Sequence, residues 1–147
     1  MAEHRARIEW KRATESFAYE DYNRDHEWTF PGGHVVPASA APAFRGSEER
    51  VDPEASFVAA LSACHMLTFI AFCARKRIVV DRYEDDAVGF LEQREDKKLA
   101  MTRVVLRPRV AFAPGHEPDA ATLAHLHERS HENCFIANSV TTEVVVE

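Results

Sequence analysis

Residues 52–76 read DPEASFVAALSACHMLTFIAFCARK and decide how the rest of the chain must fold. The segment opens with the signals of a helix start: Asp52 can cap, Pro53 suits the first helical position, and Glu54 lies near the positive end of the helix dipole. The basic residues at its end suit a helix C-terminus, so we predict one helix that runs to about Lys76. Residues 55–74 include no Asp, Glu, Lys or Arg. A helix that is apolar on nearly all sides is expected to lie buried at the centre of a soluble protein.

The length of this uncharged stretch would also allow it to cross a membrane. It contains serine, threonine and histidine and many alanines, however, which lower its hydropathy, and the rest of the chain alternates like soluble β-structure. The N-terminus, Met1 to Arg5, runs into charged residues with no apolar stretch after it, so no secretory signal is visible. We therefore expect a cytoplasmic protein with no membrane partner.

Length and composition indicate one compact domain over residues 1–147, with 46% hydrophobic residues to form a core. A net charge of −6 and scattered basic residues argue against nucleic-acid binding, which needs clustered Lys and Arg. The three cysteines are too few, and odd in number, for a secreted disulfide framework, so a reducing compartment is expected. No cofactor is expected.

Outside the central helix, hydrophobic alternation and turn residues place the other elements. We predict strands at 7–17 and 26–30 joined by a polar turn at 21–25, an extended segment at 34–43, a loop at 44–51, strands at 78–92 and 98–113 joined by a charged turn at 93–97, a helix from Pro118 to about His131, and a terminal strand at 141–146. Strands that pair in hairpins, with two helices to cover them, make an α+β fold with antiparallel sheets.

Two cysteines stand in a motif. Cys64 follows Glu54 by ten residues within the predicted helix, and Cys134 lies 70 residues further on, three residues after His131. The Pro-Glu pair, both intervals and the order of elements resemble the OsmC/Ohr family across essentially the whole chain. Asp52 and the residues after Cys134 depart from the best-studied pattern, which leaves the OsmC or Ohr branch open.

The resemblance implies a thiol peroxidase that reduces organic hydroperoxides, in an intertwined homodimer with sites at the interface. Cys64 would attack the peroxide and Cys134 would resolve the product as a disulfide, with a small-molecule or lipoyl-type dithiol as reductant. An arginine from the N-terminal hairpin would support the thiolate, and Glu54 would hold that arginine. Arg24 at the predicted turn is the first candidate for this role, and Arg45 before the helix is the second.

Elementary chemistry is consistent with these roles. Only a thiolate attacks a peroxide, and a buried cysteine in mid-helix gains nothing from the helix dipole, so Cys64 needs a cation. Glu54 lies about 15 Å from Cys64 along a straight helix and points in another direction. It must therefore act through an intervening arginine or come from a second chain.

The remaining candidate residues have weaker signals. We expect an apolar substrate pocket, lined by Phe57, Leu61, Met66 and Leu67 or their partner-chain equivalents. Cys73 is expected to be structural, and His65, which points about 100° away from its neighbour Cys64, to be a buried or interface polar residue.

Two alternatives remain. The same pocket would hold an apolar ligand in a non-enzymatic binding protein whose cysteines are incidental. His127, His131 and Cys134 would bind a metal in the other alternative, although a fourth ligand is not evident in the sequence.

Overall fold

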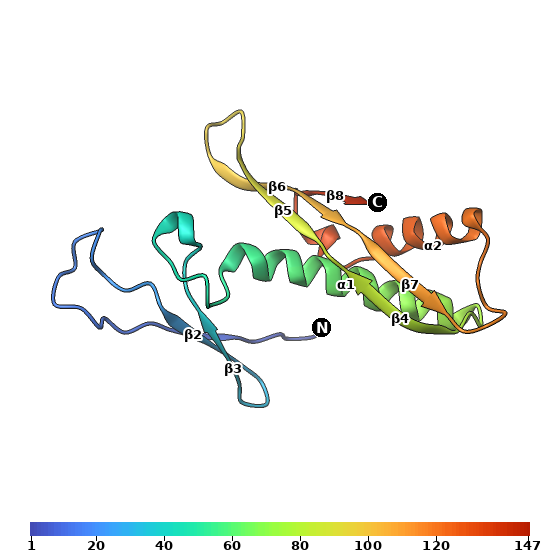
Figure 1. The fold of residues 1–147 in the computed structure, drawn as a ribbon, viewed down its shortest axis with the longest axis horizontal. Helices are drawn as coiled ribbons and strands as arrows, with labels where there is room; N and C mark the ends of the chain where they lie inside the picture. Colours follow the sequence, from blue (N-terminus) through green and yellow to red (C-terminus); the bar gives the residue numbers. More distant parts are fainter. The chain divides into compact units, whose positions relative to one another are not determined.

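The structure is a computed structural model of residues 1–147, and the chain divides into two compact units, residues 1–56 and 57–147 (Figure 1). Each unit is described by itself.

The first unit contains a three-stranded antiparallel sheet in the order β1-β2-β3: β1 (Arg7–Glu9), β2 (His26–Phe30) and β3 (His34–Ala38). Gly32 and Gly33 form the turn between β2 and β3 with φ of 90° and 79°, a conformation that favours glycine. A short 3-10 helix, η1 (Pro42–Phe44), follows β3. The extended segment predicted at 34–43 is thus an edge strand over its first half.

The strand predicted over residues 7–17 is mostly wrong, because only Arg7–Glu9 pairs with β2. Residues 10–25 form an irregular loop. The Asn23 side chain accepts the Ala13 N–H and donates to the Lys11 carbonyl, while the Trp10 indole N–H donates to the Asn23 carbonyl. These side-chain bonds satisfy backbone groups that a longer hairpin ladder would otherwise have paired.

Helix α1 (Pro53–Arg75) begins and ends close to where the sequence predicts. The Asp52 carboxylate caps it by accepting the Ala55 N–H at 2.8 Å. The residues buried within it fall at intervals of four and form a single stripe: Leu61, His65, Phe69 and Cys73. Burial on all sides was expected, whereas in the single chain only this face is covered.

By length and composition alone, α1 would be able to cross a membrane, a test that core helices of soluble proteins also pass, and only 22% of its most apolar window is buried.

The two long strands predicted at 78–92 and 98–113 are each split in two. The first becomes β4 (Val80–Asp85) and β5 (Val88–Gln93), and the second becomes β6 (Leu99–Leu106) and β7 (Pro108–Phe112). β4 pairs with β7 in one sheet, and β5 with β6 in another. The ladder breaks because Pro108 has no N–H and because the Asp85 carboxylate accepts the Arg107 N–H at 2.6 Å.

The C-terminal third supplies α2 (Ala120–Glu132), the 3-10 helix η2 (Ala137–Ser139) and β8 (Glu143–Val146). Asp119 caps α2 by accepting the Thr122 N–H. β8 joins the sheet β5-β6-β8 beside β6 and runs parallel to it, so this sheet is not purely antiparallel. The fold is α+β, as predicted.

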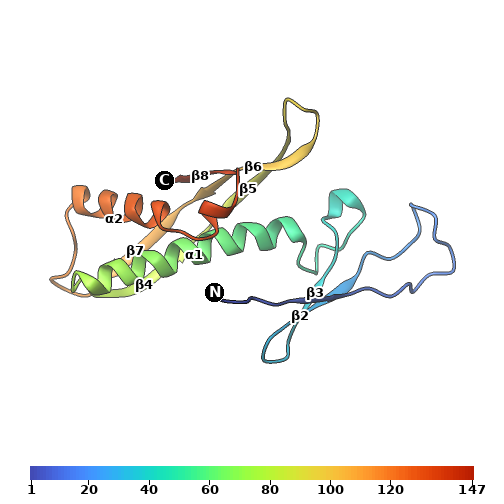
Figure 2. The same cartoon turned by 180° about the vertical axis from the view of Figure 1, so that it is seen from behind.

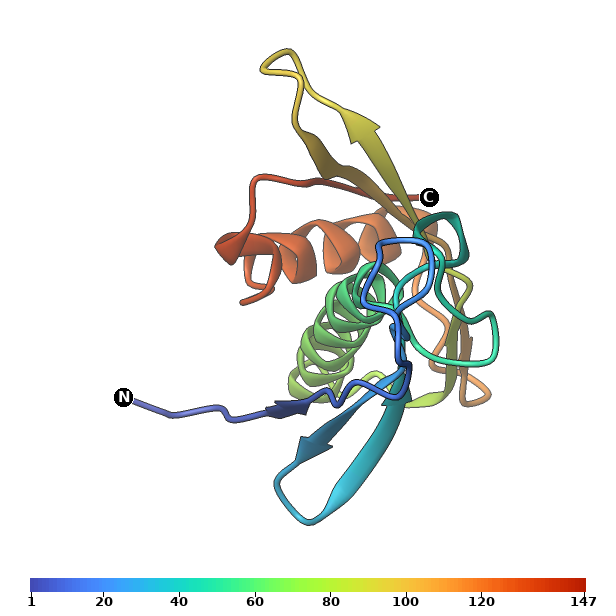
Figure 3. The same ribbon diagram turned by 90° about the vertical axis from the view of Figure 1, so that its left-hand side faces the viewer.

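Both helices cover the same side of the strands in the second unit, as the views from behind and from the end show (Figures 2 and 3). Two core clusters result. In the first, Leu61 of α1 packs against Val104 and Leu106 of β6. In the second, Phe69 and Cys73 of α1 pack against Leu126 of α2. Val80 of β4 and Val110 of β7 also pack against this second cluster, so α1 contacts α2 and both sheets.

Candidate functional site

The two predicted reactive cysteines come from different helices of the second unit. Cys64 lies on α1 and is half-buried, whereas Cys134 lies just after α2 and is 2% exposed. The backbone N–H of Cys134 donates to the His131 carbonyl at 3.3 Å, and its sulfur accepts the Ala137 N–H at 3.5 Å. The last turn of α2 and the start of η2 thus fix the position of Cys134.

The two thiols interact with each other. Burial, followed by the hydrogen-bonding interaction with the Cys64 thiol, raises the pKa of Cys134 to about 11. Both cysteines are free rather than joined in a disulfide. At neutral pH Cys134 is therefore a protonated thiol facing the half-buried Cys64.

Cys73 lies elsewhere. It is fully buried in the second core cluster, against Phe69 and Leu126, and burial raises the pKa of its thiol. A buried, protonated thiol among apolar side chains is chemically quiet, as expected for a structural cysteine.

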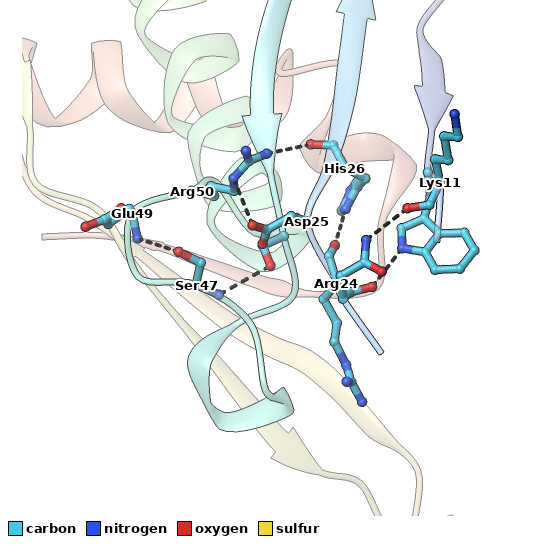
Figure 4. Close-up of polar contacts among 10 residues, drawn as sticks. Lys11, Arg24, Asp25, His26, Ser47, Glu49 and Arg50 are labelled. Carbon is cyan, nitrogen blue, oxygen red and sulfur yellow. Dashed lines mark hydrogen bonds and ion pairs between the residues drawn. The ribbon is translucent and has the colours of Figure 1, made fainter. Parts of the chain in front are cut away.

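Arg24, the predicted support of the thiolate, belongs to the first unit. Its guanidinium lies over the Tyr22 ring, 3.6 Å from the centroid, and donates to the backbone carbonyls of Tyr19 and Tyr22. Figure 4 shows this side chain extending away from His26 and from the ion pair between Arg50 and Asp25. The alternative, Arg45, stands over the Tyr19 ring at 5.8 Å. Both candidate guanidinium groups thus gather at one aromatic loop.

This loop lines an open apolar pocket of about 470 Å³ within the first unit. Its lining consists largely of aromatic and small side chains with one cation: Ile8, Trp10, Phe17, Tyr22, Arg24, His26, Ser39, Ala40 and Pro53. This pocket was not predicted from the sequence. The density of Trp, Phe and Tyr over residues 10–22 is the signal that would have indicated it.

Glu54 lies in the first turn of α1 and is half-buried. Its Oε2 is buried and has no hydrogen-bond partner. A buried carboxylate oxygen without a partner is costly, so this position is suited to a cation or another donor.

The four residues predicted to line a substrate pocket have different surroundings. Leu61 and Phe57 belong to the first core cluster, and Met66 is half-buried. Leu67 is 63% exposed and borders a hollow of about 350 Å³ together with Phe135, which is 81% exposed. Leu61 therefore acts as core in the single chain, and Leu67 is the member of the set that is open to a ligand or a partner.

The sequence did not reveal a pair of histidines beside the cysteines. His65 is 1% exposed and forms a 3.0 Å hydrogen bond with His127 of α2 through its Nε2, and the two rings are nearly coplanar. Burial, followed by the charges of His127 and His131, lowers the pKa of His65 to about 4, and burial also lowers the pKa of His127. The i, i+4 spacing of His127 and His131 suggested a metal site, but no group of three or more His, Cys, Asp or Glu side chains is arranged to hold a metal ion.

Comparisons with known proteins agree with this architecture. The family model described as OsmC-like protein matches residues 46–147. An OsmC-like protein of unknown function from Vibrio cholerae is 47% identical, covers 100% of this chain and 99% of its own, and has a TM-score of 0.96. No curated protein sequence matches the chain.

Two more distant structures share the fold. An organic hydroperoxide resistance protein from Legionella pneumophila is 16% identical, with 100% of this chain and 96% of its own covered and a TM-score of 0.71. The organic hydroperoxide resistance protein OhrB of Bacillus subtilis is 17% identical, with 97% and 96% covered and a TM-score of 0.65. With the family model spanning more than half of the sequence and a relative of nearly one-half identity along its whole length, the chain belongs to the OsmC-like family.

Proposed function

We propose that this protein is a cysteine-based peroxidase that reduces organic hydroperoxides. The observation that carries the proposal is the pair Cys64 and Cys134, two free thiols that interact although 70 residues separate them. The hydroperoxide resistance proteins that share the fold add support for this class of substrate.

The proposed reaction begins at Cys64. Its thiolate attacks the terminal peroxide oxygen, an S–O bond forms as the O–O bond breaks, and the alkoxide leaves with a proton as the alcohol. The sulfur is oxidised by two electrons to a sulfenic acid. The Cys134 thiol then condenses with it, so that a disulfide and water form. A dithiol of the small-molecule or lipoyl type reduces the disulfide by exchange.

The asymmetry between the two thiols supports this assignment of roles. With its pKa raised to about 11 by burial and by Cys64, Cys134 keeps its proton at neutral pH and is a poor first attacker. Cys64 is the more accessible of the two. A retained proton on Cys134 is also what the leaving hydroxide of the sulfenic acid needs.

Arg24 and Glu54 are proposed to assist Cys64, with Arg24 supporting the thiolate and Glu54 orienting the guanidinium. The unpartnered Glu54 Oε2 supports a role in holding a cation. Because Arg24 is bonded to the carbonyls of its own loop, this role requires it to exchange those bonds for the carboxylate and the thiolate. Arg45, close to the same tyrosine, is the alternative.

The remaining parts of the proposal concern partners and location. We propose a homodimer, because α1 leaves the apolar Leu67 and Ile70 exposed in the single chain. The exposed apolar Leu67 and Phe135, near Cys64 and Cys134 in the sequence, favour alkyl hydroperoxides over hydrogen peroxide. Three free cysteines suit the reducing cytoplasm.

A thiol titration tests the function. Addition of one equivalent of cumene hydroperoxide should remove two thiols per chain, which dithiothreitol restores. Cys64→Ser should abolish turnover, whereas the matched Cys73→Ser should leave it nearly intact, because Cys73 is sealed in the core. Cys134→Ser should stop after one turnover and accumulate sulfenic or sulfinic acid at Cys64, visible by mass spectrometry.

The outcome separates this function from the alternative of a ligand-binding protein whose cysteines are incidental. In that case no thiol is lost rapidly. Undiminished activity of Cys64→Ser would refute the mechanism, and normal cycling of Cys134→Ser would show that an external thiol resolves Cys64.

A further inference from the structure

His127 fits between two residues of α1 that lie one turn apart. Its ring is nearly coplanar with the His65 ring, with centroids 5.3 Å apart and an interplanar angle of 7°, and it stacks on Phe69, at 4.4 Å and 20°. The hydrogen bond between His65 Nε2 and His127 Nδ1 joins the same two rings at 3.0 Å. An aromatic ring held between positions i and i+4 of another helix fixes how far α2 can slide along α1.

The two cysteines lie close in sequence to this histidine contact between α1 and α2. Cys64 is the residue before His65 on α1, and Cys134 comes seven residues after His127, where the last turn of α2 holds its backbone N–H. A displacement of α2 along α1 would therefore carry one thiol away from the other. Disulfide formation requires Cα atoms about 4.4–6.8 Å apart, so a shift of even a fraction of a helical turn matters.

We infer that the His65–His127 hydrogen bond holds the two helices in the register that sets Cys64 and Cys134 at reacting distance, so that both histidines are positioning residues for the resolving step. The inference rests on the proposed two-cysteine chemistry and assigns a role to a pair of buried side chains that this chemistry does not otherwise use.

The His65–His127 hydrogen bond is also sensitive to acid. His65 Nδ1 is buried with no partner, which favours the neutral form in which His65 Nε2–H donates to His127 Nδ1. One proton added to the pair, on either ring, puts an N–H on His65 Nδ1 with no acceptor. A second proton removes the acceptor at His127 Nδ1 and leaves two adjacent cations. Acid therefore loosens the hold of α2 on α1.

The other groups around the pair oppose or support this effect. From α2, His131 faces the pair, and its Nδ1 is also buried without a partner. From β4, Asp85 favours the protonated form of His65, but its charge is the smallest of the causes that act there. Glu128 and Glu147 line a hollow with His127 and His131. Burial outweighs these carboxylates, since the pKa of both His65 and His127 is lowered.

The positioning can be measured without any peroxide. 4,4′-Dithiodipyridine reacts with Cys64 to give a mixed disulfide and one thiopyridone. Cys134 then attacks the Cys64 sulfur, the protein disulfide forms, and a second thiopyridone leaves with the electron pair of the broken S–S bond. The rate of the second release in the full-length protein reports how the two cysteines are placed. Performing the test in a Cys73→Ser background ensures that the third thiol does not contribute to the thiopyridone released.

Three variants of α2 distinguish a role in placing the two cysteines from a nonspecific structural effect of the substitution. His127→Ala should slow the second release at least about tenfold at pH 7, the scale expected when reacting groups are misplaced. His127→Asn should stay within about threefold of the parent, because the amide Oδ1 can take the place of Nδ1 as acceptor. His125→Ala is the matched control, as His125 lies on the same helix but is exposed, and it should match the parent.

The pH profile gives a readout that a merely structural role would not move. In His127→Asn the second release should fall about tenfold per pH unit, from the loss of Cys134 thiolate alone. The parent should fall more steeply as the pH approaches 4, where His65 gains a proton. A parental rate in His127→Ala, an equally slow His127→Asn, or identical slopes in parent and His127→Asn would each overturn the inference. Failure of peroxide reduction with these release rates intact would overturn only the proposed function.

Discussion

At the scale of single residues, two cysteines of one protein acquire different chemistry from their surroundings. Cys134 is buried beside Cys64 and stays protonated, whereas Cys64 is partly open to solvent. Cys73 shares the burial of Cys134 but has no second thiol beside it. In the proposed mechanism, reactivity would therefore depend on the pairing of two thiols rather than on the presence of a cysteine in α1.

His65 should make the protein sensitive to acid. Its pKa is lowered to about 4 in the folded chain, whereas an unfolded histidine titrates near 6.5. The stability it contributes is thus fully present above about pH 6.5 and is lost as the pH falls towards 4, by up to about 3 kcal/mol. Urea unfolding of the parent and of His65→Gln at pH 7 and pH 4.5 measures this, and the parent should lose more. Equal losses in the two proteins would contradict the prediction.

Some of these residues could be predicted from the sequence and others could not. The intervals from Glu54 to Cys64 and from Cys64 to Cys134 are motif distances, so both cysteines could be named without coordinates. The partner of His65 could not, because His127 lies 62 residues away and only the packing of α2 on α1 joins them. The roles of Arg24 and Glu54 stay predictions.

At the scale of elements, features set by neighbouring residues could be predicted from the sequence, whereas features set by distant residues could not. The start of α1 follows from a cap, a proline and a glutamate in consecutive positions, and the structure confirms it. The break between β6 and β7 depends on Asp85, a residue from another strand, and the failure of the strand at 10–17 depends on the Asn23 side chain. The parallel pairing of β8 with β6 likewise has no signal within β8 itself.

The contact between α1 and β5 leaves no room for a methyl group at Gly89. A Cβ at Gly89 would lie 2.5 Å from Val58 Cγ2 and 2.5 Å from Met101 Cε. The methionine end can move, but the branched valine is stiff, so we expect Gly89→Ala to lower the free energy of unfolding by about 1–3 kcal/mol. Urea titration measures the loss.

A double-mutant cycle shows whether this contact is the cause. Val58→Ala removes the obstructing methyl groups, so the double variant with Gly89→Ala should be more stable than the sum of the two single losses predicts. Strictly additive losses would place the origin of the effect elsewhere.

At the scale of the whole molecule, α1 is long and apolar but is buried along one stripe only. Between residues 59 and 74 its exposed positions recur at helical spacing and are uncharged: Ala59, Ala60, Ala63, Leu67, Ile70, Ala71 and Ala74. A surface of this kind on the helix that carries Cys64 is consistent with the proposed second copy of the chain.

Leu67→Arg should disrupt the proposed dimer. Burying a guanidinium in an apolar interface without a partner is costly, so the variant should sediment as a monomer at micromolar concentration while the parent sediments as a dimer. Leu99→Arg is the matched control, because Leu99 is similarly exposed (59%) but lies at the start of β6, and it should stay dimeric. A monomeric parent would contradict the proposal.

The short connections between the strands of the two sheets have a consequence for how the protein unfolds. Only Asp86 and Ala87 separate β4 from β5, and only Arg107 separates β6 from β7, so each sheet is continued directly into the other. Asp85 adds a tie by accepting both the Arg107 N–H and the Ser62 hydroxyl of α1. Neither sheet can detach alone, and the two should behave as a single foldon. In native-state hydrogen exchange, the slowest amides of β4 and of β6 should share one opening free energy and one dependence on denaturant.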